Sequence, residues 1–346
     1  MKKRRSFLMF LILFFVCSIS VFCAESIQLL TEAEKSGILI YWDSLTQTGL
    51  MEKNGHQISF RAGDNIVLLD NRKLSITDTP AVENGTILVS QKFFDDAESF
   101  FKTESNGIPF RVGAILVDPG HGGKDPGAMQ TFHENGKSLT VREKDITLVV
   151  GKMLYARLKT AYPDKQIILT RNTDKFLSLG ERTDIANSVK LKENEAILYV
   201  SVHVNASLDK KASGYEVWYL SPGYRRTVID KSDANNDNVL FPILNGMMEE
   251  EYTQESILIA KFIMDGLQAQ IGDKTKPRGI KAEEWFVVRN ANMPSVLIEL
   301  GFLTNYAEAQ NLNSTVYLQK ASLGIYNGIS DFIAHFEHSR GFTSSK

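Results

Sequence analysis

Cysteine is absent from this 346-residue chain after residue 23. The two cysteines that the sequence does contain, Cys17 and Cys23, both lie within its first 24 residues. Disulfide bonds and cysteine-ligated metal sites are therefore excluded from the remaining chain. A transition metal there would have to be held by histidine nitrogens and carboxylate oxygens.

An excess of basic residues is also lacking. The formal net charge is -2, from 39 Lys and Arg against 41 Asp and Glu. No nucleic-acid partner is expected, because binding a phosphate backbone favours a strong positive charge. Hydrophobic residues make up 43% of the chain and charged residues 23%, as in a globular protein with a hydrophobic core. The length allows one to three domains.

The first 24 residues have the pattern of an export signal. Residues 2–5 are all Lys or Arg, and residues 7–22 form an apolar run without a charge. That run is short for a comfortable bilayer span. We expect cleavage after Cys23 or Ala24 and no stable membrane span afterwards. A retained N-terminal anchor and lipid attachment at Cys23 are the alternatives.

Residues 25–111 are predicted to form a small β-rich module. Short strand-like runs are separated by turn signals, among them Asn54-Gly55 and Asn84-Gly85, which are strong cues for hairpins. His56 lies in one of these turns and is expected to be solvated. The expected strands are residues 37–42, 57–60, 65–69 and 86–89, followed by a short helix over 93–101.

From Gly113 the pattern changes to alternating strands and helices. It predicts an α/β domain over residues 112–338, with a mainly parallel twisted sheet flanked by helices, followed by a polar tail over 339–346. The apolar run 196–202 is expected to be a central strand, covered on both faces. The other expected strands are 114–117, 166–169, 215–220 and 295–298, and the expected helices begin at Glu143 and cover 179–189, 256–271 and 317–336.

Four residues that could carry chemistry stand at the ends of these elements. His121 follows the first strand in a glycine-rich turn, Glu143 begins a helix, His203 ends the central strand and Glu299 ends the last strand. Ligands of α/β proteins bind at the carboxyl edge of the sheet. Two histidines and one glutamate form a known catalytic zinc set, and a second glutamate can act as a base.

Each of the four residues has an ordinary alternative. His121 could be solvated in an ordinary strand-to-loop turn. Glu143 could favour the positive end of its helix, and His203 could be a hydrogen-bonded core histidine. Glu299 is harder to explain in this way, because a carboxylate among apolar neighbours is costly to bury without a partner. Two other motifs are discounted: residues 122–124 lack the Ser or Thr of a phosphate loop, and the acidic run 230–237 lacks the spacing of a calcium loop.

Residues 115–336 resemble the zinc-dependent N-acetylmuramoyl-L-alanine amidases of bacterial cell walls, the type-3 amidase family. The matching segments are VDPGHGG (117–123), DPGA (125–128), REKD (142–145), Thr170 with Arg171, Arg182 with 186–187, SVHVNA (201–206) and PSVLIELGFLTN (294–305). The first module is similar to β-rich modules of secreted cell-wall enzymes, including the copper-amine-oxidase N-terminal-like type, over residues 40–49.

The resemblance implies zinc on His121, Glu143 and His203, with Glu299 as the catalytic carboxylate and Asn205 as a substrate-binding residue. It implies peptidoglycan as the substrate, cut at the amide between N-acetylmuramic acid and L-alanine, for cell-wall remodelling or cell separation. Export fits, since peptidoglycan lies outside the cytoplasm, and the expected location is the periplasm or cell envelope. The rivals are a non-catalytic peptidoglycan-binding protein and a zinc hydrolase of another amide.

Two segments depart from the family pattern. The loop 129–141 is longer than in many relatives and contains His133, which is either a competing ligand or a surface residue. Residues 221–255 form a long insertion with three consecutive glutamates, 249–251. We expect either an acidic surface helix or an autoinhibitory helix that covers the zinc until an activator protein displaces it.

Overall fold

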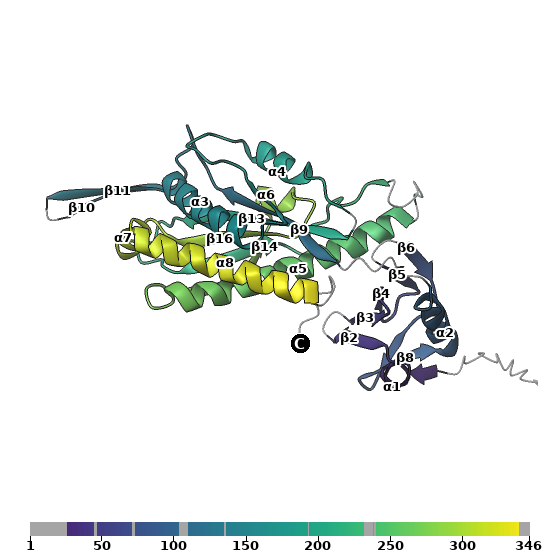
Figure 1. Cartoon of the computed structure of the whole chain (residues 1–346). Coiled ribbons are helices and arrows are strands. Elements are labelled where there is room, and N and C mark those ends of the chain that lie inside the picture. Colours follow the sequence, from purple (N-terminus) through teal and green to yellow (C-terminus); the bar gives the residue numbers. More distant parts are fainter. Residues whose placement is uncertain are drawn as a thin grey trace, which may run out of the picture.

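Figure 1 shows the computed structural model of the chain, which describes residues 26–338 except 45–46, 71–72, 104–109, 135, 193, 232–237 and 239. The expected export signal over 1–24, with both cysteines, and the polar tail 339–346 lie outside the described residues. Among the helices that the structure describes, none is long and apolar enough to cross a membrane.

The N-terminal module contains two antiparallel sheets and two helices around their own hydrophobic core. One sheet has the order β1-β8-β7 and the other the order β2-β3-β4-β5-β6. The elements are β1 (Ser26–Gln28), α1 (Leu29–Lys35), β2 (Leu39–Asp43), β3 (Thr48–Lys53), β4 (His56–Arg61), β5 (Ile66–Leu69), β6 (Lys73–Ile76), β7 (Ala81–Glu83), β8 (Thr86–Ser90) and α2 (Gln91–Phe100).

Both predicted Asn-Gly hairpins of the module are confirmed. Asn54 and Gly55 join β3 to β4 with φ of 54° and 83°, and Asn84 and Gly85 join β7 to β8 with φ of 50° and 79°. Two successive left-handed residues match the twist of the flanking strands, and Asn and Gly adopt this conformation most readily. These dipeptides therefore fix the register of the two hairpins.

His56 was expected to be solvated, and this prediction is wrong. The side chain is buried, with 4% of the residue's surface exposed. Its Nδ1 lies 2.8 Å from Asp70 Oδ2, and its Nε2 lies 3.2 Å from the carbonyl oxygen of Thr103. The ring also packs against Phe100, at 4.6 Å between centroids. Both nitrogens have polar partners, which is why burial is tolerated.

The second domain is built on a sheet with the strand order β12-β9-β13-β16-β14-β15. Strand β14 is antiparallel to β16, whereas the other neighbouring pairs are parallel. Helices α3, α5 and α8 cover one face, and the shorter α4 and α6 lie on the other (Figure 1). The strands are β9 (Arg111–Pro119), β12 (Gln166–Leu169), β13 (Glu195–Asn205), β14 (Tyr215–Leu220), β15 (Pro277–Glu283) and β16 (Ser295–Phe302). The helices are α3 (Glu143–Ala161), α4 (Leu179–Asn187), α5 (Leu240–Ile271), α6 (Phe286–Arg289), α7 (Tyr306–Leu312) and α8 (Thr315–His338).

Strand β13 is central, as predicted, and its successive side chains point alternately to the two faces of the sheet. Val200 and Val202 point into the core beneath α3, α5 and α8. Tyr199, Ser201 and His203 alternate with them and therefore face the side of α4 and α6. The polar site described below lies on this second face.

Three segments fold differently from expectation. Residues 129–141, expected to be a loop, form the hairpin β10 (Met129–Glu134) and β11 (Lys137–Arg142), which projects from the body of the domain (Figure 1). Strand β15 was not predicted, because the edge strand PRGIKAE has no apolar alternation. Helix α5 begins at Leu240 rather than at residue 256, with Pro242 in its first turn, where proline is tolerated.

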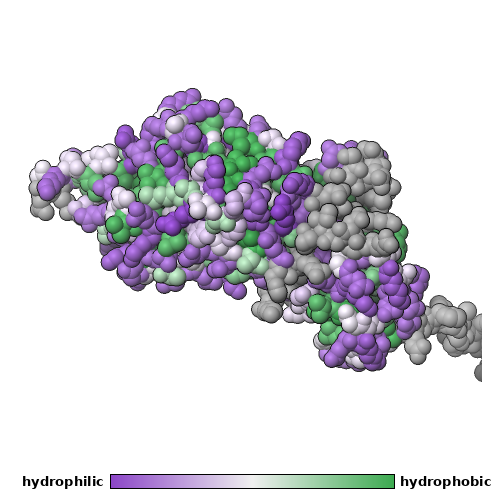
Figure 2. Space-filling model, viewed as in Figure 1, coloured by the Kyte–Doolittle hydropathy of each residue, from purple (hydrophilic) through white to green (hydrophobic). Residues whose placement is uncertain are grey.

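In the view of Figure 2 the surface is largely hydrophilic, with hydrophobic residues in separate patches.

The contact between α5 and α8 depends on glycine. A Cβ on Gly266 would stand 2.2 Å from the carbonyl oxygen of Gly324 in the facing backbone. Replacing Gly266 by alanine is therefore expected to destabilise the fold by about 1–3 kcal/mol, measured as a lower urea midpoint. Gly246 lies in the same helix with nothing within 4 Å of its added Cβ. The matched change Gly246→Ala should keep or raise stability, and an equal loss in both variants would contradict this account.

Candidate metal centre

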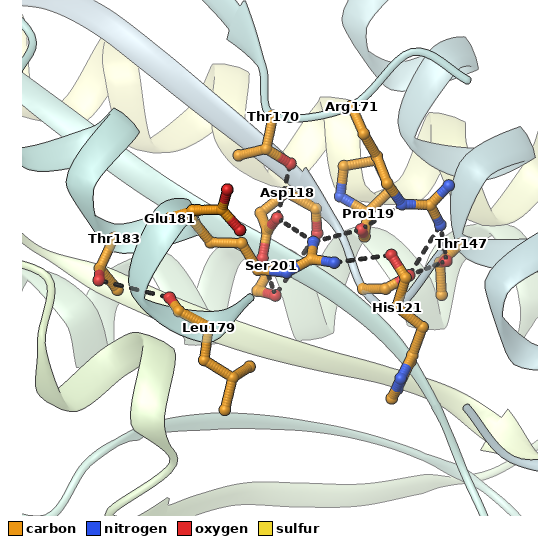
Figure 3. A network of polar contacts seen from close by, with 12 residues as sticks. Asp118, Pro119, His121, Thr147, Thr170, Arg171, Leu179, Glu181, Thr183 and Ser201 are labelled. Atoms are coloured by element: carbon orange, nitrogen blue, oxygen red, sulfur yellow. Dashed lines mark hydrogen bonds and ion pairs between the residues drawn. The ribbon is translucent and has the colours of Figure 1, made fainter. Parts of the chain in front are cut away.

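The turn that carries His121 is anchored by Asp118, near the end of β9. This carboxylate is fully buried and accepts hydrogen bonds from Thr170 Oγ1 at 2.6 Å and Ser201 Oγ at 2.9 Å (Figure 3). It also accepts hydrogen bonds from Arg182 Nη1 at 2.7 Å and Tyr199 OH at 2.8 Å. Burial alone would raise the pKa of Asp118, but the charge of Arg182 and these hydrogen bonds lower it. The carboxylate therefore stays ionised in the core and holds four elements together.

Two buried arginines bind the backbone of the same turn. Arg182 donates to the carbonyl oxygens of Pro119 at 2.8 Å and His121 at 2.6 Å, and Arg171 donates to those of Pro119 at 2.9 Å and Gly120 at 2.7 Å. His121 has a φ of 59°, which is uncommon for a residue other than glycine. The arginines thus hold a strained backbone conformation that aims the imidazole (Figure 3).

Three side chains converge beside this turn. His121 Nε2 lies 3.1 Å from Glu143 Oε1, and His203 Nδ1 lies 3.0 Å from the same oxygen. One ligand atom of each residue falls within 4.8 Å of the others. They come from the turn after β9, the first residue of α3 and the end of β13. Within the described part of the chain this is the one group of three such residues.

The charges of this cluster favour a cation. Burial would raise the pKa of Glu143, but its hydrogen bonds with His121 and His203 lower it well below the ordinary range. Burial would lower the pKa of His121, but the hydrogen bond and charge of Glu143 raise it. The ionised carboxylate of Glu143 places a negative charge between the imidazole rings of His121 and His203. A metal ion would compete with protons for binding to these three side chains.

Neighbouring groups fix the orientation of two of the three side chains. His121 Nδ1 lies 2.8 Å from Asp125 Oδ2, so the neutral ring presents a lone pair at Nε2. The carboxylate of Glu143 accepts hydrogen bonds from the backbone nitrogens of Ala128 at 2.8 Å and Val204 at 3.0 Å. The cluster is therefore held in place by groups outside the three residues themselves.

The residues present fit a zinc ion. Two imidazole nitrogens and one carboxylate oxygen are the donor set of open catalytic zinc sites. The backbone also leaves the cluster the space it needs. A Cβ on Gly120 would stand 2.3 Å from the His203 ring, and one on Gly127 would stand 2.5 Å from Glu143 Oε2. Gly120 and Gly127 are thus required by the close packing of the three side chains.

Replacing Asp125 by alanine is expected to weaken zinc binding about 10–100-fold, because His121 loses the partner that fixes its tautomer. Competition with a chromophoric chelator measures the affinity. Asp164 is exposed and pairs with Arg111 at 3.3 Å, so Asp164→Ala serves as the matched control. Equal affinities of the two variants would show that Asp125 does not orient the ligand.

Glu299 lies beside the cluster on β16. In the sheet register it pairs with His203 on β13 and with Glu216 on β14. Its Oε2 is shielded from solvent and has no hydrogen-bond partner among the described residues. Burial and the charges of Glu143 and Glu216 raise the pKa of Glu299 well above its ordinary value. A carboxyl group in this state can hold or release a proton next to the cluster.

Asn205 follows His203 by two residues, and protein groups hold its amide. Its Nδ2 donates to Glu216 Oε1 at 2.6 Å, and its Oδ1 accepts a hydrogen bond from the backbone nitrogen of Ala206 at 2.8 Å. A role of Asn205 in binding substrate stays a prediction. Its partner Glu216, which is 1% exposed, was missed from the sequence. The same signal that singled out Glu299, a carboxylate on an apolar strand, could have found it.

His133 does not join the cluster. It is exposed on hairpin β10–β11, where its Nδ1 lies 2.8 Å from Ser138 Oγ. Of the two interpretations considered for this residue, the structure favours the surface residue. The hairpin itself begins at Met129 and ends at Arg142, directly before Glu143, so it is inserted between His121 and Glu143 of the cluster.

The described part of the insertion 221–255 begins away from the cluster. Because β14 is antiparallel to β16, the chain leaves Leu220 at the edge of the sheet opposite to His203 and Glu299. Glu249 accepts a hydrogen bond from the backbone nitrogen of Arg226 at 2.7 Å, and Glu250 pairs with Arg61 of the N-terminal module. These two glutamates therefore do not cover the cluster in this structure, and residues 232–237 and 239 of the insertion lie outside the described residues. A role of the insertion in autoinhibition stays a prediction.

Comparisons with known proteins identify the family of this chain. The family described as N-acetylmuramoyl-L-alanine amidase matches residues 115–331, which include all four residues, and the copper amine oxidase N-terminal domain matches residues 28–100. The chain is 28% identical over 247 residues to N-acetylmuramoyl-L-alanine amidase AmiA of Salmonella typhimurium, a match that covers 67% of this chain and 80% of the relative. It is 33% identical over 224 residues to the uncharacterized protein YqiI of Bacillus subtilis, with 65% and 86% covered. The solved structure of N-acetylmuramoyl-L-alanine amidase AmiC2 of Nostoc punctiforme is 28% identical, with 64% of this chain and 97% of that chain covered and a TM-score of 0.47.

Proposed function

We propose that this chain, which belongs to the N-acetylmuramoyl-L-alanine amidase family, is a zinc enzyme that frees stem peptides from peptidoglycan. The bond cut is the amide between the lactyl group of N-acetylmuramic acid and L-alanine. The observation that carries the proposal is the convergence of His121 Nε2, Glu143 Oε1 and His203 Nδ1 on one point, with Glu299 beside them.

The three converging residues would hold the zinc, and Glu299 would move the proton. Zinc in such a site supplies Lewis acidity, which polarises a carbonyl group and makes water a stronger acid. Glu299 takes a proton from the water whose oxygen attacks the amide carbon. It then gives this proton to the nitrogen of L-alanine as the carbon–nitrogen bond breaks. The unpartnered, shielded oxygen of Glu299 supports this role, because no other group competes for the proton.

The proposal includes the cellular setting and the division of the chain. An export signal over residues 1–24 would bring the protein to the periplasm or cell envelope, where its substrate lies. There the β-rich module 25–111 would precede the catalytic domain 112–338. Release of stem peptides opens cross-links of the wall, so the activity would serve cell-wall remodelling or cell separation.

Digestion of purified sacculi by the chain from residue 25 tests the proposal. The expected products are intact stem peptides with a free N-terminal L-alanine, identified by mass spectrometry, and glycan strands without peptide. Fragments cut within the stem would point to a zinc hydrolase of another amide. Binding to sacculi without any released peptide would point to a non-catalytic wall-binding protein.

A further inference from the structure

Two cations lie on the side of the metal centre that faces β14 and β15. Arg278 Nε donates to Glu216 Oε2 at 2.8 Å, and Lys281 Nζ pairs with the same oxygen. The other oxygen of Glu216 accepts the amide of Asn205 at 2.6 Å. One buried carboxylate therefore collects two positive side chains from the edge strand β15.

These cations are close to the proposed catalytic glutamate. Glu216 and Glu299 are direct partners in the antiparallel pair β14–β16, and partners in such a pair have Cα atoms about 4.5–5.5 Å apart. Their side chains share the face of the sheet that also carries His203. Strand β14 lies one strand spacing, about 4.7–4.9 Å, from the strand of Glu299, and two spacings, roughly 10 Å, from the strand of His203. A group bound by Arg278 and Lys281 would thus lie on the Glu299 side of the metal centre.

The charges of the cation pair are not fully balanced. Within the described part of the chain, Glu216 is the one carboxylate that forms an ion pair with either cation. Two positive charges against one negative leave an excess of one positive charge. The side chain of Arg278 is 37% exposed and that of Lys281 is 32% exposed, whereas that of Glu216 is 2% exposed. The excess charge therefore faces solvent.

Aromatic rings hold both cations in position. Lys281 Nζ lies 5.0 Å from the centroid of the Trp218 ring, and the guanidinium carbon of Arg278 lies 4.9 Å from that of Phe302. Cation–π contacts and the shared carboxylate reduce the rotamer freedom that binding would otherwise cost. The pair is thus held in place before any further anion binds.

We propose that Arg278 and Lys281 bind the α-carboxylate of the second stem residue, on the leaving-group side of the scissile amide. This inference rests on the proposed function. The lactyl carboxyl group is consumed in the amide, so the neighbouring glycan offers no anion, whereas the stem peptide carries free carboxylates. The second residue's α-carboxylate follows the scissile nitrogen by about two residues, or roughly 7 Å of extended chain, so it reaches the pair when the scissile nitrogen lies beside Glu299.

Two muramyl dipeptides that differ only in this group test the proposal. In one the α-carboxyl group of the second residue is a carboxylate, and in the other it is a primary amide. Wild-type protein with zinc should favour the carboxylate substrate about tenfold in kcat/KM. Lys281→Met should lower kcat/KM for the carboxylate substrate about tenfold and change that for the amide substrate less than twofold. Lys281→Arg keeps the charge and should restore the preference.

Each variant is measured on both dipeptides. A general loss of activity would lower kcat/KM for both, whereas a loss of recognition would lower it only for the carboxylate substrate. Lys159→Met is the matched control, because Lys159 lies about 24 Å along α3 from Glu143. Equal kcat/KM for the two dipeptides in the wild type, or an equal loss for both in Lys281→Met, would overturn the proposal while leaving the amidase intact. If the wild type released no peptide from either substrate or from sacculi, the proposed function itself would fail.

Discussion

Replacing Glu299 with glutamine will stop peptidoglycan hydrolysis while the chain keeps its zinc. Glutamine has the same shape but cannot accept the proton of the attacking water or deliver it to the leaving nitrogen. General acid–base catalysis contributes about 100–10,000-fold, and kcat should fall by about that factor. Release of stem peptides from sacculi measures activity, and elemental analysis of the dialysed protein measures the metal.

The matched control for this variant is Glu283→Gln. Glu283 is exposed at the end of β15, so the same chemical change there should leave activity intact. Folding should not limit the Glu299 variant, since the change replaces a carboxyl group whose shielded Oε2 has no hydrogen-bond partner among the described residues. Wild-type rates in Glu299→Gln would remove this residue from the mechanism. Loss of metal in the same variant would instead make Glu299 a ligand.

Replacing His203 with alanine will remove both metal and activity. Loss of a partner outside the ligand set alone costs about 10–100-fold in affinity, so loss of a ligand should cost more than about 100-fold. The bound zinc should fall from about one ion per chain to a small fraction after dialysis. Chelator treatment of the wild type should abolish activity in the same way, and added zinc should restore it.

His133→Ala separates this effect from a general loss of histidine. His133 is exposed on the projecting hairpin and lies outside the cluster of three residues. The variant should keep its zinc and its rate. The assignment of the ligands would fail if His203→Ala still held a full equivalent of zinc, or if His133→Ala lost it.

The sequence predicted the members of the cluster because each stands where a regular element ends. The apolar runs before His121, His203 and Glu299 marked strands, and the helical spacing after Glu143 marked α3. The carboxyl ends of parallel strands meet at one edge, so these residues could be placed together before any coordinates. The roles given to them remain proposals for the experiments above.

The groups that support the cluster could not be inferred in this way. Arg171 and Arg182 act on the backbone carbonyls of a turn more than 50 positions earlier in the chain. Nothing in local periodicity indicates such a long-range contact. The prediction that His56 is solvated was wrong for a related reason, because its partner Thr103 is 47 positions away. Polar residues near turns are thus poorly assigned when their partners come from distant segments.

The insertion shows the limit of family resemblance. Its glutamates suggested a cover over the metal, but the direction of β14 makes this segment begin at the opposite edge of the sheet, and Glu250 pairs with Arg61 of the N-terminal module. Strand direction follows from the pairing of β14 with β16, which the apolar run of residues 215–220 does not reveal. Hairpin β10–β11 was likewise hidden, although Asn135-Gly136 in the sequence is a hairpin cue.

Helix α5 is a single rod of 32 residues, about 48 Å long, and it serves two structural units at once. Its second half packs in the catalytic core through residues such as Ile263 and Leu267. Its first half meets the N-terminal module, where Leu244 packs with Leu68 and Glu250 pairs with Arg61. A chimera that grafts this module onto a different hydrolase would therefore need residues 240–255 as well, because the docking platform of the module is encoded in the catalytic half of the chain.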